Sequence, residues 1–358
     1  MTDDHSDEEY FERLVDKESL QQYLQENLGE AAIFEIEQHQ AGHSNETLFL
    51  TWGDQEYVIR RPPPGETAEK AHDVLREYKV VSALQDTDVP LPETILECDD
   101  TSIIGSDFYL TDRLHGDVIR NSEPERFATP EARAAIGKEL VDSLVAIHEV
   151  DYEEVGLGDF GYPEGFTERQ VNRWTKQLDW AFEVTTDVRD VPLLDDVGDW
   201  LSANLPEENT ASLVHGDYKL DNVMYAPTMS PEIVAVFDWE LSALGNPFTD
   251  LGWMLAFWRD SGDPEPAVPE LVSTVPERPG YMTRAELVKR YERKTGVTFE
   301  QDRFYRTLAV YKLAGLGEMF FRRHLDGNSD DSLYPVMENR VPRLAERAMR
   351  IINGEEPL

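Results

Sequence analysis

The stretch "LVHGDYKLDNVMYA", residues 213–226, decides how this 358-residue chain is interpreted. Two apolar residues lead into the tripeptide H-G-D, and Asn222 follows five positions after Asp217. The strand-like run "NVMY" comes directly behind, and a second apolar run, "IVAVF", ends at Asp238, 238 − 217 = 21 residues beyond Asp217. Runs rich in β-branched and aromatic residues favour strands. The sequence therefore predicts two short strands with polar side chains at their ends.

The order and spacing of these residues resemble a known catalytic loop. "HGDYKLDN" is similar to the H-R-D-x-x-x-x-N loop of the protein kinase-like superfamily, in the H-G-D form of aminoglycoside phosphotransferases and choline kinases. "DWELSALGNPFTDLGW", residues 238–253, resembles the D-W-E…G-x-P…D-L segment of the same phosphotransferases. The likeness extends over about residues 30–325 and is greatest to the branch that includes kinase-like domains fused to acyl-CoA dehydrogenases. Further fragments that carry it are "GHSNETLFL", "YVIRRPPPG", "REYKVVSAL" and "VPLPETI".

This resemblance implies an α+β, bilobal protein kinase-like fold and Mg²⁺-dependent transfer of the γ-phosphoryl group of ATP or GTP. The acceptor would be a hydroxyl of a small metabolite, with hydroxyacyl compounds, amino alcohols and aminoglycosides all open. Asp217 would accept a hydrogen bond from that hydroxyl, and Asn222 and Asp238 would hold Mg²⁺, which prefers oxygen ligands. Lys219 either contacts the γ-phosphate or faces solvent.

Three neighbouring residues have other expected roles. His215 is expected to be a packed, hydrogen-bonded support of the loop rather than a base. Glu240 either reaches a second metal ion or caps the segment that follows it. Asp250 is expected to be a buried carboxylate that fixes the loop backbone.

A second group of residues is expected to bind the nucleotide. Glu77 falls on the apolar stripe of a helix predicted over residues 65–84. A carboxylate on such a stripe is costly unless it is paired, so a cationic partner is expected. The kinase pattern pairs this glutamate with a basic residue on the third strand, where "YVIRR" offers Arg60 or Arg61.

The segment "AGHSNETLFL" would form the hairpin over the phosphates, and "FYLTDRLHGD" would present backbone groups to the base. Ser44 and Asn45 either donate hydrogen bonds to phosphate or serve as ordinary turn residues. The hairpin contains one glycine, Gly42, where protein kinases have three, so it resembles the phosphotransferase type.

Composition excludes several classes of protein. The net charge of −39 would repel nucleic acid and anionic lipid, so neither is expected as a partner. No apolar run is long enough to span a membrane, and the acidic start is unlike an export signal. Cys98 is the only cysteine, which is typical of the cytoplasm. The excess of acidic residues reflects either a local cleft that binds a cationic substrate or an adaptation of the whole protein surface to salt. Its spread along the chain favours salt adaptation and a halophilic source.

The chain is predicted to contain an acidic disordered tail (1–16), an N-terminal nucleotide-clamping lobe (17–113) and a helical C-terminal lobe (114–358) that carries the catalytic loop and the substrate site. Nothing in the sequence indicates an oligomeric state. Strands are predicted over 33–40, 47–52, 56–62, 108–114, 222–226 and 233–239, and helices over 16–29, 65–84, 129–150, 283–296 and 304–321.

One stretch contains two motifs that are typical of nucleotide-binding sites. "VGLGDFGYPEG", residues 155–165, contains both G-x-G-x-x-G and D-F-G. A glycine loop grips phosphate only when it leaves a strand and opens a helix or hairpin. The acidic "DYEEV" precedes these glycines and Pro163 follows them, so a surface loop is predicted.

Two functional alternatives stay open beside a small-molecule phosphotransferase. The first is a catalytically silent, nucleotide-binding regulator, although all the expected polar positions are filled. The second is a protein kinase, which the short segment after Asp238 disfavours because it leaves no room for an activation loop.

Overall fold

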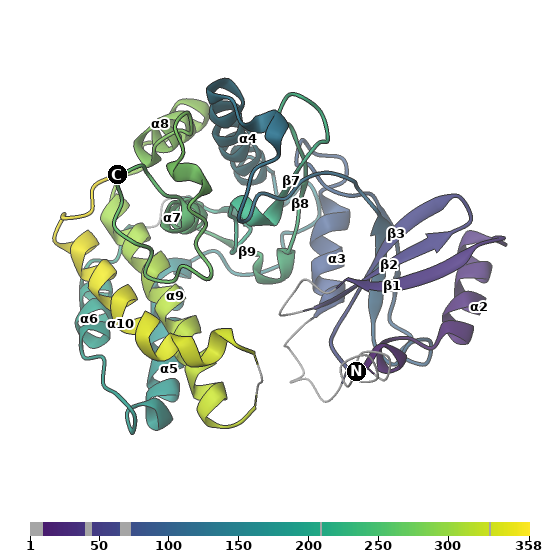
Figure 1. Cartoon of the computed structure of the whole chain (residues 1–358), viewed down its shortest axis with the longest axis horizontal. Coiled ribbons are helices and arrows are strands. Elements are labelled where there is room, and N and C mark those ends of the chain that lie inside the picture. Colours follow the sequence, from purple (N-terminus) through teal and green to yellow (C-terminus); the bar gives the residue numbers. More distant parts are fainter. Residues whose placement is uncertain (1–9, 40–44, 65–72, 208–209, 329–330) are drawn as a thin grey trace. The chain divides into compact units, whose positions relative to one another are not determined.

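The computed structural model of the chain describes residues 10–39, 45–64, 73–207, 210–328 and 331–358. The chain divides into two compact units (Figure 1). The N-terminal unit comprises Met1–His115 together with Asp238–Glu240, and the C-terminal unit comprises Gly116–Phe237 and Leu241–Leu358. Each unit is described by itself below.

The N-terminal unit is built on one antiparallel sheet of five strands in the order β1-β2-β3-β5-β4. Their bounds are β1 Phe34–His39, β2 Glu46–Trp52, β3 Gln55–Arg61, β4 Thr94–Cys98 and β5 Phe108–Asp112. The four strands predicted for this region are confirmed. The edge strand β4 was not predicted, because Pro90, Pro92 and acidic residues surround it and obscure its pattern.

The alternation of side chains along β3 separates two adjacent arginines. Ile59 pairs with Leu48 and points into a core shared with Leu20 and Leu24 of helix α2 (Lys17–Leu28). Arg61 lies on this same face, because side chains two apart in a strand share a face. Arg60 therefore points to the opposite face, where Glu77 of helix α3 (Val74–Ala83) lies.

The start of the described chain differs from the expected tail. Residues 10–14 are helical, and Leu14 and Val15 are buried in the core of the N-terminal unit. Arg61 is also buried and donates hydrogen bonds to the carbonyl oxygens of Leu14 and Ile104. Residues 10–16 are thus anchored rather than disordered, because apolar side chains inside an acidic stretch still bury surface. The rest of the expected tail, residues 1–9, lies outside the described residues.

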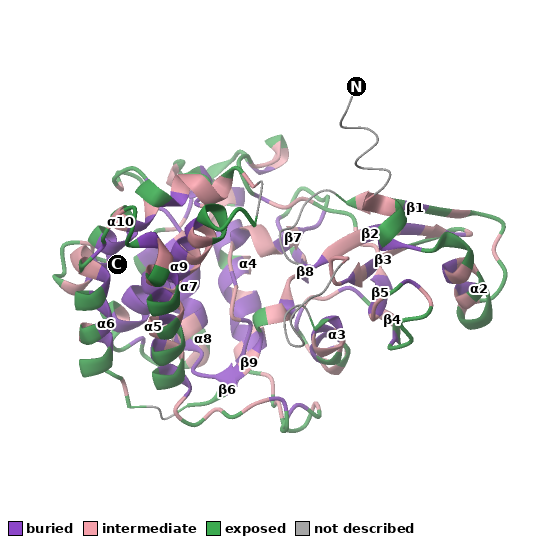
Figure 2. Cartoon of the chain, turned by 90° about the horizontal axis from the view of Figure 1, so that it is seen from below, coloured by how far each residue is buried: buried purple, intermediate pink, exposed green. Residues whose placement is uncertain are grey.

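The C-terminal unit is mainly helical. Its helices are α4 Pro130–His148, α5 Phe166–Thr185, α6 Leu193–Ala203, α7 Phe248–Phe257, α8 Arg284–Thr295, α9 Asp302–Leu325 and α10 Leu333–Ile352. Helix α9 packs against α5, α7 and α10, and its middle is buried on nearly all sides, as its apolar sequence predicts (Figure 2). The predicted capping box of α8 is present, with Thr283 and Glu286 bonding to each other's backbone.

Four short strands complete this unit and carry the motif. They are β6 Ser212–Val214, β7 Val223–Tyr225, β8 Ile233–Val236 and β9 Ala243–Gly245, paired as β6-β9 and β7-β8. The stretch at 155–165 is a loop, as predicted, with Leu157 and Phe160 buried and Asp159 exposed. Among the described residues, no helix combines the length and the apolar composition that a bilayer crossing requires.

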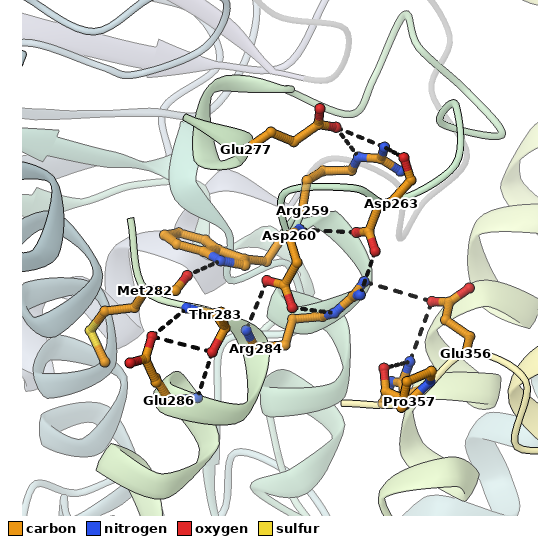
Figure 3. A network of polar contacts seen from close by, with 12 residues as sticks. Arg259, Asp260, Asp263, Glu277, Met282, Thr283, Arg284, Glu286, Glu356 and Pro357 are labelled. Carbon is orange, nitrogen blue, oxygen red and sulfur yellow. Dashed lines mark hydrogen bonds and ion pairs between the residues drawn. The ribbon is translucent and has the colours of Figure 1, made fainter. Parts of the chain in front are cut away.

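A network of ion pairs joins the segments around α7, α8 and the C-terminal end of the chain (Figure 3). Arg259 pairs with Glu277, and Arg284 pairs with Asp263 at 2.8 Å. Glu356 accepts hydrogen bonds from Arg347 at 3.0 Å and from Arg306 at 3.3 Å. Because the side chains of Arg306 and Arg347 are only 3% and 10% exposed, Glu356 neutralises two largely desolvated guanidinium groups.

Replacing Glu356 by glutamine should destabilise the protein by about 3 kcal/mol, because it removes the charge that compensates these buried arginines. Burial alone would raise the pKa of Glu356, but the charge of Arg347, followed by those of Arg306 and Arg284, outweighs it and lowers that pKa. The stabilisation is therefore present above about pH 4.5 and is lost as the pH falls through the lowered pKa.

Chemical denaturation of the wild type and of Glu356→Gln between acid and neutral pH measures this difference. Glu355→Gln is the matched control, because Glu355 is exposed and forms no ion pair within the described chain. Equal stability of Glu356→Gln and wild type at neutral pH, or a difference that persists in acid, would contradict the assignment.

Candidate active site

The loop between β6 and β7 is fixed by its own backbone. Strand β6 is buried and delivers the chain to His215 and Gly216. Gly216 has a φ of 83°, and a Cβ atom there would lie 2.4 Å from the carbonyl oxygen of Leu241, so only glycine fits. The N–H groups of His215 and Gly216 both donate to Asp250, at 2.6 and 2.8 Å. Asp250 therefore fixes the loop backbone, as expected.

Asp250 and the loop residue His215 are both buried, and both side chains form hydrogen bonds. Asp250 lies 3.2 Å from Nε2 of His148; burial would raise the pKa of Asp250, but the hydrogen bond from His148 and nearby charges lower it. His215 bonds through Nε2 to the carbonyl oxygen of Phe237 at 2.8 Å and accepts at Nδ1 from the N–H of Asp217. Burial lowers the pKa of His215, which keeps the ring neutral. His215 thus supports the loop rather than serving as a base.

The carboxylate of Asp217 receives three hydrogen bonds. Nε1 of Trp253 donates to Oδ1 at 2.7 Å, and Lys219 and Asn222 each donate to Oδ2 at 2.8 Å. Burial alone would raise the pKa of Asp217, but the charges of Lys219 and Lys312 lower it. Asp217 is therefore ionised at neutral pH and oriented by donors from two sides.

Asn222 is held in a defined orientation by the same contacts. Its Nδ2 donates both to the side chain and to the backbone carbonyl of Asp217. No described residue donates to its Oδ1, so the amide oxygen is the atom available to a cation. The N–H of Phe237 donates to the carbonyl oxygen of Asn222 at 2.9 Å, which ties the end of β8 to the start of β7. Phe237 immediately precedes Asp238 in the chain.

Within the N-terminal unit, Arg60 forms the predicted pair with Glu77. Nη2 of Arg60 lies 3.4 Å from Glu77, whose side chain is 2% exposed, and 3.7 Å from Oδ1 of Asp238. The N–H of Trp239 donates to Glu77 at 3.3 Å. Glu77 therefore holds both the arginine and the backbone that follows Asp238.

Two further features of this unit are informative. Asp238 has a φ of 67°, and among the described residues only Gln301 is another non-glycine with a positive φ. Asn45 is 4% exposed, and neither polar atom of its side chain has a hydrogen-bond partner. Ser44, which was expected to contact phosphate, lies outside the described residues.

The predicted residues thus form two groups. In the C-terminal unit, Lys219 and Asn222 both contact Asp217, and in the N-terminal unit, Glu77 and Asp238 both contact Arg60. Sequence reasoning did not identify Trp253 or Lys312. Lys312 had a detectable signal, because it is a single ammonium group in the middle of an apolar helix.

Comparisons with known proteins identify the fold and the family of the chain. The model of the phosphotransferase enzyme family matches residues 35–282. The chain is 35% identical to acyl-CoA dehydrogenase family member 11 of Rattus norvegicus over 94% of its own length and 43% of that relative, so it spans less than half of it. A solved structure of a candidate aminoglycoside phosphotransferase from Ralstonia eutropha JMP134 has a TM-score of 0.81 at 32% identity, covering 95% of this chain and 99% of the other.

A more distant structural neighbour carries ligands. It is the aminoglycoside phosphotransferase APH(4)-Ia in a ternary complex with AMP-PNP and hygromycin B, with a TM-score of 0.59 at 16% identity over 92% of this chain and 98% of that one. These neighbours confirm the α+β, protein kinase-like fold that the sequence resemblance implies. None of the comparisons bears on salt adaptation, which stays a prediction. The family match and the relatives above 30% identity together show that the chain belongs to the phosphotransferase enzyme family.

Proposed function

We propose that this protein transfers the γ-phosphoryl group of ATP or GTP to a hydroxyl group of a small molecule in a Mg²⁺-dependent reaction. The observation that carries the proposal is the Asp217 carboxylate, which Trp253, Lys219 and Asn222 hold ionised and oriented. Phosphoryl transfer passes through a loose transition state, so positioning and charge neutralisation matter more than covalent assistance. An oriented carboxylate that accepts a hydrogen bond from the acceptor hydroxyl provides the positioning.

The proposed step is a direct displacement. A bond forms between the acceptor oxygen and the γ-phosphorus while the bond from that phosphorus to the β–γ bridging oxygen breaks, and the nucleoside diphosphate leaves. The hydroxyl proton passes to Asp217 and then to solvent. Because its pKa is lowered, Asp217 is a weak base, so it orients the hydroxyl first and receives the proton late in the step.

Arg60 and Lys219 are the proposed nucleotide contacts, together with Glu77 and Ser44. Glu77 and Thr47 fix the guanidinium of Arg60, and a fixed guanidinium suits phosphate oxygens. Lys219 lies between Asp217 and Asp221, where it would meet a γ-phosphate brought to Asp217. The buried, unpartnered amide of Asn45 supports a ligand at the turn where Ser44 was expected to contact phosphate.

Asn222 and Asp238 are the proposed metal ligands. Among the described residues no group of three or more histidine, cysteine or acidic side chains could hold a metal ion. Mg²⁺ does not need one, because it keeps waters and uses few protein oxygens beside the phosphates of its nucleotide. The amide oxygen of Asn222 and the carboxylate of Asp238 are oxygen ligands of that kind. The backbone of Asp238 adopts a left-handed conformation, and strained conformations of this kind are typical of functional sites. Bound Mg²⁺ would neutralise charge on the transferred phosphates.

Replacing Asp217 by asparagine should lower kcat by at least about a hundredfold, because the oriented proton acceptor is lost. Nucleotide affinity should stay close to that of the wild type, because Asp217 is assigned to the acceptor. Transfer assays over a panel of hydroxylated metabolites, together with calorimetric nucleotide titration, measure both quantities.

Asp159→Asn is the matched control for that experiment. Asp159 is the exposed residue of the D-F-G stretch, so its replacement should leave both quantities unchanged. Full activity of Asp217→Asn would remove the assigned role. Tight binding of Mg²⁺ and ATP by the wild type without transfer to any acceptor would favour the silent regulator instead.

Replacing Asp238 by alanine should abolish the dependence of nucleotide binding on Mg²⁺, because a proposed ligand of the ion is removed. Titration of ATP in the presence and absence of Mg²⁺, with Asp159→Ala beside it, measures this dependence. If Asp238→Ala binds ATP with the Mg²⁺ dependence of the wild type, Asp238 does not hold the metal.

A further inference from the structure

Lys312 of helix α9 places a partly buried ammonium group against the catalytic loop. Its Nζ donates to the carbonyl oxygen of Gly216 at 2.5 Å and lies 4.0 Å from the centroid of the Trp253 ring. Trp253 in turn donates to Asp217, so the ammonium group is one aromatic ring away from the proposed acceptor-binding carboxylate. A lysine carries three N–H donors, and Gly216 uses only one of them.

No carboxylate among the described residues lies within ion-pair distance of the Lys312 ammonium group. The chain has 72 acidic residues against 33 lysines and arginines, so acidic partners are abundant. Several other cations have carboxylate partners, since Glu77 pairs with Arg60 and Glu356 pairs with Arg306 and Arg347, whereas the buried Arg61 donates to carbonyl oxygens. Desolvating an ammonium group that has no ion-pair partner destabilises the protein. Such a group is retained where a bound anionic ligand offsets that destabilisation.

The surroundings of Lys312 are consistent with a site for an anion. Burial lowers the pKa of Lys312 to about 8, while the charges of Asp217 and Asp250 act against that shift. The charges of Arg173 of α5 and Lys219 of the loop lower it further, so cations as well as carboxylates act on Lys312. Aromatic rings accompany each of them: Trp253 lies near Lys312, Trp174 near Arg173 and Phe257 near Lys219.

We infer that Lys312 determines specificity by binding an anionic group, such as a carboxylate, of the acceptor whose hydroxyl Asp217 orients. This inference rests on the proposed phosphotransferase function. A positively charged acceptor, such as an amino alcohol or an aminoglycoside, would meet like charges at Lys312 and Arg173. A neutral acceptor would leave the ammonium group without a direct ion pair. The substrate class is therefore an anionic hydroxylated metabolite.

The test compares three classes of probe on the full chain with Mg²⁺ and ATP: short hydroxycarboxylic acids, their primary amides, and amino alcohols of matched length. The wild type should phosphorylate a hydroxycarboxylate with a kcat/KM at least about tenfold above that of its amide. Lys312→Met should remove this preference by raising KM for the carboxylate about tenfold, with little effect on the amide. Lys312→Arg, which keeps the charge, should restore most of it.

The pH profile adds a signature that a purely structural lysine would not give. Because the charge of Lys312 is lost as the pH rises through about 8, the preference of the wild type for the carboxylate over the amide should fall across that pH. Lys312→Met should show no such fall. Lys176→Met is the matched control, since Lys176 is exposed on the neighbouring helix α5 and should leave both rates unchanged.

The outcomes separate this inference from the function on which it rests. If the wild type phosphorylates amino alcohols or amides at least as well as carboxylates, the anionic acceptor is wrong and the phosphotransferase stands. If Lys312→Met lowers carboxylate and amide turnover equally, Lys312 only supports the Gly216 backbone. If no probe of any class is phosphorylated and no nucleoside diphosphate forms, both the function and the inference fail.

Discussion

The bond of the Asp250 carboxylate to two successive backbone N–H groups is the constraint on which the rest of the site depends. These N–H groups belong to His215 and Gly216, which directly precede Asp217, and Gly216 adopts a left-handed conformation that no larger residue fits. The loop can therefore leave β6 in one direction only. Because the acceptor of these bonds is buried and ionised, the bonds gain strength from the low local dielectric. The direction of the Asp217 side chain follows from this backbone.

Charge in this protein is organised differently on the surface and in the interior. The chain as a whole carries a net charge of −39, yet the buried Arg306 and Arg347 and the partly buried Arg60 are matched with carboxylates. Ion pairs of this kind offset the desolvation free energy of the charged groups and fix the positions of those groups. Lys312 departs from this pattern beside the carboxylate assigned to the chemistry. The anion site inferred at Lys312 differs from the acidic cleft that the overall charge allowed.

Patterns within single segments of the sequence predicted most of the helices and strands and several residues of the candidate site. The spacing of Asp217, Asn222 and Asp238, and the position of Glu77 on an apolar helix face, are properties of single segments that the sequence displays directly. The choice between Arg60 and Arg61 is a matter of strand register, which depends on pairing with β2 and cannot be counted from one strand. Trp253 and Lys312 reach the loop from positions 36 and 96 residues away from the atoms that they bond, so only tertiary packing reveals them. The ordered residues 10–16 were missed because two buried side chains outweigh an acidic composition.

The central claim is that Asp217 orients an acceptor hydroxyl for direct attack on the γ-phosphorus. ³¹P NMR of the wild type with Mg²⁺, ATP and a mixture of hydroxylated metabolites tests it most directly. The account predicts that a phosphomonoester resonance grows in step with ADP and that both require Mg²⁺. Nucleotide that stays intact while bound to the protein, with no phosphomonoester formed from any acceptor, would contradict the account.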